Sequence, residues 1–367
     1  MLILVIIFML FLLFLFVMMS FYYYKLIKRF LSFINKEKLL KKYKKLFILL
    51  SIIFMLLSFN LFNMIGLFFM HFIFISLLVD LIYLCVKKII KNKKIISLYN
   101  SSLVPLLITI LVIIYGLFNI RNIIETRYTI YTDKNIDEEL EILFIADSHY
   151  GDVFKKEELH NIKKRLDKVN ADIVIIGGDV VDEATSKKDM EYIFSVFGDI
   201  KNKYGIYYVY GNHDRQLYSN RPRYKETELI DTIKRNNINI LDDNYISFKD
   251  NFVIAGRDDF SVGRDSLKNV LKDVSKDDYL IVVDHQPLNY DENVENNVDL
   301  IVSGHTHGGQ IFPVELFIKL LHTADLSYGY KDYKGLDAIV TSGLVGWGYP
   351  IRTSRHSEYV VINIKEK

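Results

Sequence analysis

Long apolar runs dominate the first 120 residues and restrict this part of the chain to structures that can surround apolar side chains. Residues 2–24 contain no charged side chain. As a helix they would reach roughly 34 Å at about 1.5 Å per residue, enough to cross the ~30 Å hydrocarbon core of a bilayer. The run is too long for the apolar part of a cleavable signal peptide and lacks its basic start. We therefore expect a transmembrane helix over about 2–24.

Two further stretches predict three more spans. Between residues 46 and 86 only Asp80 is charged, and this interval is about twice as long as one crossing requires. It is expected to fold back at Asn60–Gly66, where two Asn and a Gly supply turn chemistry. A last apolar run covers 103–120. The sequence therefore predicts a membrane domain over 1–120 with four transmembrane helices, at about 2–24, 46–62, 66–86 and 103–120.

Positive charge is concentrated between the predicted spans. Nine Lys and Arg lie in 25–45 and five in 87–94, and both intervals separate an odd span from an even one. Because Lys and Arg are retained on the cytoplasmic side, the chain after residue 120 is expected outside the cytoplasm, in a multi-pass protein of the cell membrane. Beside membrane spans, such runs are better explained as topology signals and contacts with anionic lipid. Nucleic acid is therefore not expected as a primary partner.

Two ionisable side chains, His71 and Asp80, fall at membrane depth in the third predicted span. Residues of this kind are candidates for a transport function, because a charge inside a bilayer is costly to keep. Asp80, however, lies near the expected cytoplasmic end of its span, where water can reach it. The sequence leaves both interpretations open.

The charge balance divides the chain at about residue 120. Residues 1–120 hold fourteen Lys and Arg against Glu37 and Asp80, whereas the remainder holds 32 basic and 42 acidic residues, so the net charge of +2 describes neither half. A split of this size argues against a single soluble globule. The single cysteine, Cys85, excludes a disulfide framework and a Cys-rich zinc site.

After residue 120 the pattern changes to that of a soluble α/β domain. Residues 121–140 are polar and are expected to form a stalk or linker with a first strand, followed by a domain over 141–367. Helical periodicity is present in Lys155–Val169 and Met190–Lys203. Short runs rich in β-branched residues predict strands in eight segments: Ile142–Ala146, Ile173–Ile176, Ile206–Tyr210, Phe252–Ala255, Tyr279–Asp284, Leu300–Val302, Ala338–Thr341 and Tyr359–Ile364.

Residues able to bind a metal follow five of the predicted strands. Ligands in open α/β sheets bind outside the carboxyl ends of the strands, so these five loops could meet at one place. They are Asp147-Ser148-His149, Gly178-Asp179-Val180-Val181-Asp182, Gly211-Asn212-His213-Asp214, Asp284-His285-Gln286-Pro287 and Gly304-His305-Thr306-His307-Gly308-Gly309-Gln310. An isolated Asp-x-His or Gly-Asp is common without any function. Five such loops in order, each after a predicted strand, indicate a shared site.

The residue types in these loops indicate divalent metal ions. In extended backbone, residues i and i+2 face the same way, so Asp147 and His149 can bind one ion, and His305 and His307 can divide between two. Glycines in the loops permit sharp turns and close backbone approach. Carboxylate, imidazole and amide oxygen together suit Mn, Fe, Zn or Co better than Ca, which favours oxygen alone.

In chain order the loops spell D-x-H, G-D-x-x-D, G-N-H-D, H and G-H-x-H, and residues from about Ile142 to Ile364 resemble the calcineurin-like metallophosphoesterase superfamily. The closest resemblance is to its bacterial membrane-associated branch, which includes phosphodiesterase-like proteins and hydrolases of a lipid-linked sugar pyrophosphate. That resemblance rests on four segments: the last ligand loop, Ala255-Gly256-Arg257-Asp258-Asp259, Ser342-Gly343-Leu344 and Pro350-Ile351-Arg352. The tail, Arg355-His356-Ser357-Glu358, departs from the Pro-Glu expected there. The resemblance implies an α/β fold, a four-layer αββα sandwich, preceded by the all-α membrane region.

The resemblance also implies a role for each loop residue. Two divalent metal ions would be bound, each of them Mn, Fe, Zn or Co. The first ion would be bound by Asp147, His149 and His307, and the second by Asn212, His285 and His305. Asp179 would lie between the two ions and bind both. Hydroxide held between the metals would attack phosphorus in line. His213 would act as a catalytic residue at the leaving-group oxygen, and Asp214 would orient its ring. Asp182 would hold its own loop.

These features predict a membrane-anchored dimetal phosphohydrolase, a metal-dependent phosphoric ester hydrolase whose partners are a phosphoester substrate and the lipid bilayer. Two alternatives stay open: a pyrophosphatase for a lipid-linked nucleotide or sugar, and a catalytically silent metal-binding membrane sensor. The amphipathic segment Val314–Leu321 either meets a membrane surface, which favours the pyrophosphatase, or is an ordinary packed helix. Substrate contacts are expected among four residues: Arg257, Trp347, Tyr349 and Arg352.

Overall fold

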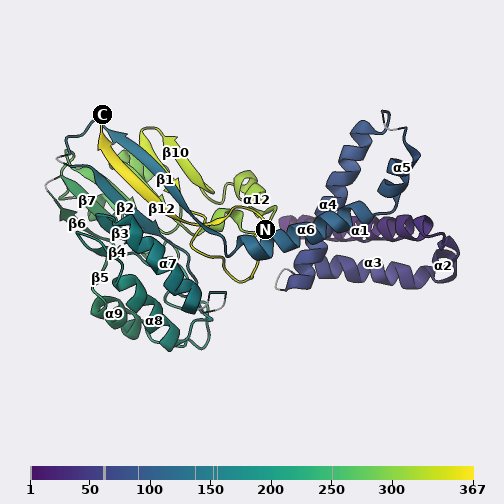
Figure 1. The fold of residues 1–367 in the computed structure, drawn as a ribbon, viewed down its shortest axis with the longest axis horizontal. Coiled ribbons are helices and arrows are strands. Elements are labelled where there is room, and N and C mark those ends of the chain that lie inside the picture. Colours follow the sequence, from purple (N-terminus) through teal and green to yellow (C-terminus); the bar gives the residue numbers. More distant parts are fainter. Residues whose placement is uncertain are drawn as a thin grey trace. The chain divides into compact units, whose positions relative to one another are not determined.

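Two units make up the chain in the computed structural model, Met1–Tyr115 and Gly116–Lys367 (Figure 1). The structure describes residues 2–60, 63–89, 91–136, 138–151, 153–154, 156–249 and 251–367. The border between the units falls inside a helix, slightly before the predicted border at residue 120. The last turn of that helix therefore belongs to the second unit.

The apolar runs of the first unit form helices at the predicted places. They are α1 (Leu2–Phe33), α3 (Lys44–Phe59), α4 (Met64–Val86) and α6 (Leu103–Asn119), with the short basic helices α2 (Glu37–Lys42) and α5 (Lys93–Asn100) between them. Among the described residues, two helices are long and apolar enough to cross a membrane, Met9–Phe33 and Met64–Val86. A third candidate is α5 with α6, bent by 64°, if the pair forms one span. The number four stays a prediction, because α3 has only 16 residues.

A break separates α3 from α4 at the predicted turn. The Asn63 side chain caps α4 by accepting a hydrogen bond from the Gly66 N–H at 2.8 Å. A Cβ at Gly66 would lie 1.7 Å from the Asn60 carbonyl oxygen, so only glycine permits this approach. Residues 61 and 62 of the predicted turn lie outside the described residues. The apolar interval 46–86 thus divides into two helices.

Charged and polar side chains inside the first unit are matched to one another. Asp80 accepts hydrogen bonds from Arg29 at 2.7 Å, Lys25 at 3.2 Å and the Tyr99 hydroxyl at 3.0 Å. His71 is fully buried, with Nδ1 2.8 Å from the carbonyl oxygen one turn earlier. Asp80 is therefore neutralised by two cations of α1, which a structural role explains without transport.

Large apolar side chains face outward on the same unit. Phe21 on α1, Leu81 on α4 and Leu111 on α6 are 67%, 59% and 65% exposed. A soluble helix places such residues inward. This outward placement fits helices whose solvent is lipid.

Two six-stranded sheets form the second unit (Figure 1). The first runs in the order β1 (Ile123–Thr132), β12 (Ser357–Glu366), β2 (Leu140–Ile145), β3 (Ile173–Ile176), β4 (Ile206–Tyr208) and β5 (Ile238–Ile240). The second runs β10 (Gly329–Tyr333), β11 (Leu336–Val340), β9 (Leu300–Ser303), β8 (Tyr279–Val283), β7 (Phe252–Gly256) and β6 (Asn244–Phe248). Strands β2 to β4 are parallel neighbours, as are β8 and β9. Their carboxyl ends therefore lie together within each sheet.

Three buried clusters show a four-layer sandwich, as predicted. Facing side chains of both sheets, such as Phe144 and Ile281, form the central cluster. A second cluster joins the outer face of the first sheet to α7 (Lys156–Val169), α8 (Lys187–Gly198) and α9 (Glu226–Arg235). A third joins the outer face of the second sheet to α10 (Leu267–Val270) and α11 (Tyr290–Glu295). The strands are apolar on both faces because both faces are covered.

All eight predicted strands are present, and the first strand expected within 121–140 is β1; three others were not predicted: β5, β6 and β10. β1 takes up half of the segment expected to be a stalk or linker with a first strand, and it pairs with β12 over ten residue pairs. Alternating β-branched and aromatic residues give this segment its strand preference. Polar residues at its exposed and half-buried positions make its composition similar to that of a linker. The helix predicted at 190–203 is α8, which begins and ends earlier. The helix predicted at 155–169 is α7, and its residue 155 lies outside the described residues.

Candidate metal centre

The five predicted loops meet where strands of both sheets end. Asp147 follows β2, and its N–H donates to the Gly178 carbonyl in the loop after β3 at 3.0 Å. The two sheets are joined here as well, because the His305 N–H, after β9, donates to the Asp147 carboxylate at 3.1 Å. His285, after β8, has Nδ1 2.8 Å from the Gly177 carbonyl oxygen. The parallel strands thus deliver the loops to one place, as expected for α/β sheets.

Six of the seven predicted ligands fall into two groups with ligand atoms within 4.8 Å of one another. The groups are Asp147, His149 and His307, and Asp179, His285 and His305. Asn212, the seventh, adjoins the second group, since its Oδ1 lies 2.9 Å from His305 Nδ1. The resemblance assigns the first group to one metal ion and His285, His305 and Asn212 to the other, and Asp179, which it assigns to both, lies in the second group.

The first group brings imidazole and carboxylate atoms together in a buried place. His149 Nε2 lies 3.3 Å from His307 Nε2 and 3.7 Å from Asp179 Oδ2. His307 Nε2 lies 3.6 Å from Asp147 Oδ1. Burial lowers the pKa of His307 and raises that of Asp147 to about 6. A neutral His307 offers a lone pair, as a metal ligand must.

The second group shows most directly that the residues fit a cation. The Gly177 carbonyl accepts from His285 Nδ1, and the Nε2 atom of the same ring faces Asp179 Oδ2, 3.1 Å away. Two electron-pair donors at this distance repel each other unless a cation or a proton lies between them. Burial opposes ionisation of Asp179, but positive charge on the facing rings of His285 and His149 lowers its pKa well below the usual value, and Asp179 in turn raises the pKa of His285. Burial also lowers the pKa of His305 to about 4, which keeps this ring neutral.

The backbone at these ligands is held in an unusual conformation. Five of the seven have positive φ, from 38° to 68°, a region that residues other than glycine rarely adopt: Asp147, His149, Asp179, His305 and His307. Backbone strain of this kind gathers at functional sites, where surrounding contacts enforce it. A Cβ at Gly211 would lie 2.2 Å from Asp179 Oδ1, and one at Gly304 would lie 2.4 Å from Asp147 Oδ2. Both glycines therefore let a carboxylate approach the neighbouring loop.

The contacts of His213 correct one expectation. Its Nδ1 lies 2.8 Å from Glu183 Oε2, so Glu183 and not Asp214 orients the ring. The Asp214 carboxylate instead accepts N–H bonds from residues 179, 180, 181 and 211. It is fully buried and points at the backbone, away from the ring. Burial opposes protonation of His213, but Glu183 raises its pKa.

Asp182 holds its own loop, as predicted. Its Oδ1 accepts from the Ala184 N–H at 2.8 Å and lies 3.3 Å from the Thr185 hydroxyl. Its Oδ2 lies 3.5 Å from His149 Nδ1, on the side of the ring away from His307. The carboxylate therefore also fixes the orientation of a predicted ligand, as outer carboxylates do in metal sites.

Of the four expected substrate contacts, only Trp347 has a described contact with the rings of the histidines. Its ring is 40% exposed and lies 5.0 Å, between centroids, from that of His213. Arg352 is fully buried and donates to the carbonyls of residues 307, 342 and 345. Arg257 is 2% exposed and donates to Asp243 and to the carbonyl of residue 265. Both arginines hold loops together, which corrects the expectation that they bind substrate. Tyr349 is half-buried.

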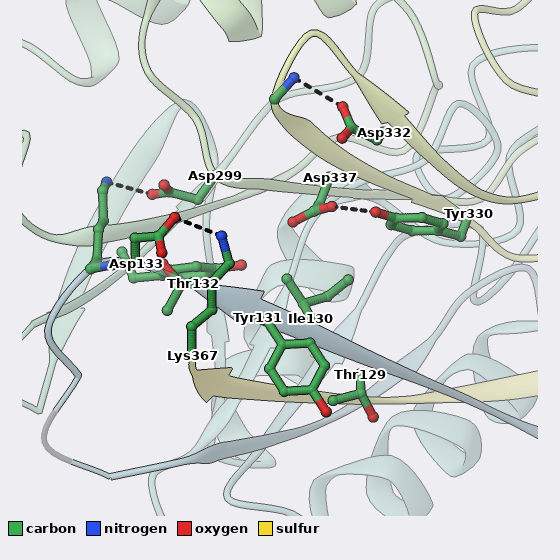
Figure 2. Close-up of a pocket in the computed structure, with 13 residues that line it drawn as sticks. Thr129, Ile130, Tyr131, Thr132, Asp133, Asp299, Tyr330, Asp332, Asp337 and Lys367 are labelled. Atoms are coloured by element: carbon green, nitrogen blue, oxygen red, sulfur yellow. Dashed lines mark hydrogen bonds and ion pairs between the residues drawn. The ribbon is translucent and has the colours of Figure 1, made fainter.

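A separate cavity of about 600 Å³ lies at the other ends of the strands (Figure 2). Tyr279 and Asp299 stand at or just before the starts of β8 and β9, whereas His285 and His305 follow the ends of these strands. Carboxylates drawn in Figure 2 are already paired, such as Asp133 with Lys367 Nζ at 2.6 Å. None of the seven predicted ligands lines this cavity, so it is no part of the candidate metal centre.

The two-sheet sandwich with its clustered histidines and carboxylates is that of a metallophosphoesterase, and the chain belongs to the calcineurin-like phosphoesterase family, which matches residues 140–309. An uncharacterized metallophosphoesterase of Aquifex aeolicus is 30% identical over 66% of this chain and 91% of its own length. One of Helicobacter pylori is 31% identical over 65% of this chain and 63% of its own. A transmembrane protein with metallophosphoesterase domain of Danio rerio is 24% identical over 73% of this chain and 63% of its own. The chain thus spans under two thirds of some relatives.

Proposed function

We propose that this protein is a membrane-anchored phosphohydrolase with two divalent metal ions, acting on a phosphomonoester or phosphodiester. The observation that supports this most is the close approach of His285 Nε2 to Asp179 Oδ2, at 3.1 Å, within two adjoining ligand groups. In the proposal Asp147, His149 and His307 hold one metal, and Asn212, His285 and His305 hold the other. Asp179 is the ligand common to both, since its carboxylate faces His149 and His285.

The side chains around these ligands support hydrolysis of a phosphoester. Bound divalent cations supply Lewis acidity toward phosphoryl oxygens and a nucleophile at neutral pH. Glu183 holds the proton on His213 Nδ1 and raises the pKa of the ring. His213 can then donate a second proton from Nε2 to the leaving-group oxygen. Trp347, against the His213 ring, provides an apolar wall for the departing group.

The experiment that tests this function uses the purified full chain in lipid nanodiscs. Hydrolysis of activated monoesters, diesters and pyrophosphates is measured with Mn, Zn or Mg, together with bound metal per chain. Asp179→Asn should lose activity while retaining the fold, and Asp231→Asn, an exposed change on α9, serves as the matched control. Full activity in Asp179→Asn contradicts the shared-ligand assignment. Bound metal without hydrolysis of any ester supports the sensor instead.

The arrangement of cations supports an extracytoplasmic position of the phosphoesterase unit in a multi-pass protein with four spans. A reporter that is active only outside the cytoplasm, fused after Lys367, should be active. The same reporter fused in the basic segment between α4 and α5 is the control and should be silent. The opposite pattern reverses the orientation.

A pyrophosphatase for a lipid-linked substrate is the second candidate. It is favoured by α12 (Val314–Leu321), which follows the His307 loop and has no buried residue. The absence of buried residues in α12 argues against the alternative that this segment is an ordinary packed helix. Rates with a detergent-dispersed lipid pyrophosphate and with a soluble diester separate the two candidates: a preference for the lipid pyrophosphate supports the second.

A further inference from the structure

Helix α12 exposes its apolar side chains beside the candidate metal centre. Leu316, Phe317, Leu320 and Leu321 are 53%, 46%, 63% and 69% exposed. Phe312, just before the helix, is 45% exposed. Soluble helices turn such residues toward a core. An uncovered group of this size marks a surface that something else covers.

The polar side of α12 is the side attached to the domain. Glu315 accepts from Arg355 of the domain at 2.8 Å, and within the helix it pairs with Lys319 at 2.7 Å. A Cβ at Gly309 would lie 2.4 Å from the Glu315 N, so the start of the helix lies tightly against the ligand loop η1 (His307–Gly309). The helix is therefore fixed in place by polar contacts and turns apolar residues away from the domain.

The chain's own connection to its apolar helices indicates what covers this surface. The last turn of α6 belongs to the second unit, and there the Asn119 side chain donates to the carbonyls of Arg352 and Arg355 at 3.1 and 2.9 Å. The same segment, 352–355, holds α12 through the Arg355–Glu315 pair. One short loop thus contacts both the end of a candidate span and the exposed helix.

We propose that α12, with Phe312, lies in the surface of the bilayer that α6 leaves, and that anionic lipid contributes to its binding. Apolar residues on one side with cations at the border are typical of interfacial helices. Lys319 and Arg355 have side chains 57% and 41% exposed, and each can reach a lipid phosphate. Phe118, at the end of α6, is a further exposed apolar residue of the second unit, at 75%.

Lipid contact of α12 is independent of catalysis and is measured without an activity assay. The full chain carrying Cys85→Ser and Leu320→Cys is labelled with an environment-sensitive fluorophore and placed in vesicles of phosphatidylcholine and phosphatidylglycerol. The control carries Tyr131→Cys, which is 59% exposed beside the cavity of Figure 2. Spin-labelled lipid should quench the Leu320 probe at least about twofold more than the control probe. Equal quenching at both positions overturns the proposal.

A second variant separates insertion from other causes of quenching. Leu316→Glu, read by a probe at Leu321→Cys, should reduce lipid quenching to the control level, because a carboxylate is costly to insert. Leu217→Glu, at a 55% exposed position elsewhere, should not. Vesicles of phosphatidylcholine alone should give weaker quenching, and equal quenching there contradicts the role of anionic lipid. A probe shielded from aqueous iodide but not reached by spin-labelled lipid indicates a second copy of the chain and also overturns the proposal.

Discussion

A buried carboxylate has different kinds of neighbouring groups in the two units of this protein. In the first, Asp80 is surrounded by Arg29, Lys25 and Tyr99, so donors of the protein itself satisfy the carboxylate. In the second, Asp179 Oδ2 faces His285 Nε2 at 3.1 Å, and His149 and His307 bring ring nitrogens to 3.3 Å. The first arrangement is complete as it stands, whereas the second gathers imidazole and carboxylate atoms that a proton or a metal ion can join.

The difference teaches how a structural ion pair can be told from a binding site. Both carboxylates are nearly inaccessible, at 9% for Asp80 and 1% for Asp179, so burial does not separate them. The chemical type of the groups around each carboxylate does separate them. Guanidinium and ammonium groups can only donate, whereas neutral imidazoles and carboxylates converge as electron-pair donors. Positive φ at most of the second set adds strain that the Asp80 cluster lacks.

Removal of metal should have the largest effect, and it should change the activity and the stability of the second unit only. Chelation is expected to abolish hydrolysis. It should also lower the free energy of unfolding of that unit by about 2.7 kcal/mol for each metal otherwise present at about 100 times its Kd. Calorimetry of the full chain, with and without chelator, measures this. In Asp179→Asn the metal-dependent shift should shrink, and an equal shift of the helical unit would remove the contrast between the two regions.

Substitution of His213 should affect the reaction more than metal binding. His213→Gln is expected to lower kcat about 10²- to 10³-fold, because it removes the proposed proton donor and no predicted ligand. Metal analysis and steady-state kinetics on one preparation check this. A loss of metal that parallels the loss of rate would show that His213 supports the ligands.

Substitution of Asp80 should affect only the first unit. Asp80→Ala leaves Arg29 and Lys25 without their carboxylate, which should cost about 2–3 kcal/mol of stability in a partly buried setting. Unfolding in mixed micelles, followed by the loss of helical circular dichroism, measures the effect, with Asp231→Ala as control. Hydrolysis in the folded variant should equal that of the wild type. A selective loss of activity would connect the two units.

The smallest expected effect is at Glu183, a positioning residue. Glu183→Gln should lower kcat about tenfold and leave KM unchanged, because it weakens the orientation and charge of His213. Glu183→Asp, which keeps the carboxylate, should recover part of the rate. If both variants change KM and kcat alike, Glu183 supports the loop as a whole.

Most residues of the candidate site could be predicted because they lie in short sequence motifs. Asp147 and His149, or His305 and His307, are recognisable because each pair follows a strand at fixed spacing. Glu183 was missed because its partner is 30 residues away and no spacing connects them. The burial of Arg352 was missed as well, since its three carbonyl partners are set by tertiary structure. The orientation of the His213 ring was assigned to Asp214 and not to Glu183 for the same reason, because this contact too is set by tertiary structure.

The fold was predictable where both faces of a strand are buried. Ile173–Ile176 is apolar throughout and reads as a strand without ambiguity. β1 alternates partly exposed polar residues with apolar ones, so its composition resembled that of a linker. Alternation in Ile123–Thr132 was nevertheless a usable signal. Apolar runs predicted the helices well, but not which of them are long enough to span a bilayer.

The pairing of β1 with β12 gives the second unit a mechanical property. β1 begins four residues after the end of α6 and runs parallel to the last strand of the sandwich over ten residue pairs. A pull transmitted through α6 along the axis of β1 loads all of these hydrogen bonds in shear at once. The bonds cannot be opened one by one from the end at which the force enters. The domain is thus tethered by a shear clamp, which resists a pull along β1 with all ten residue pairs at once.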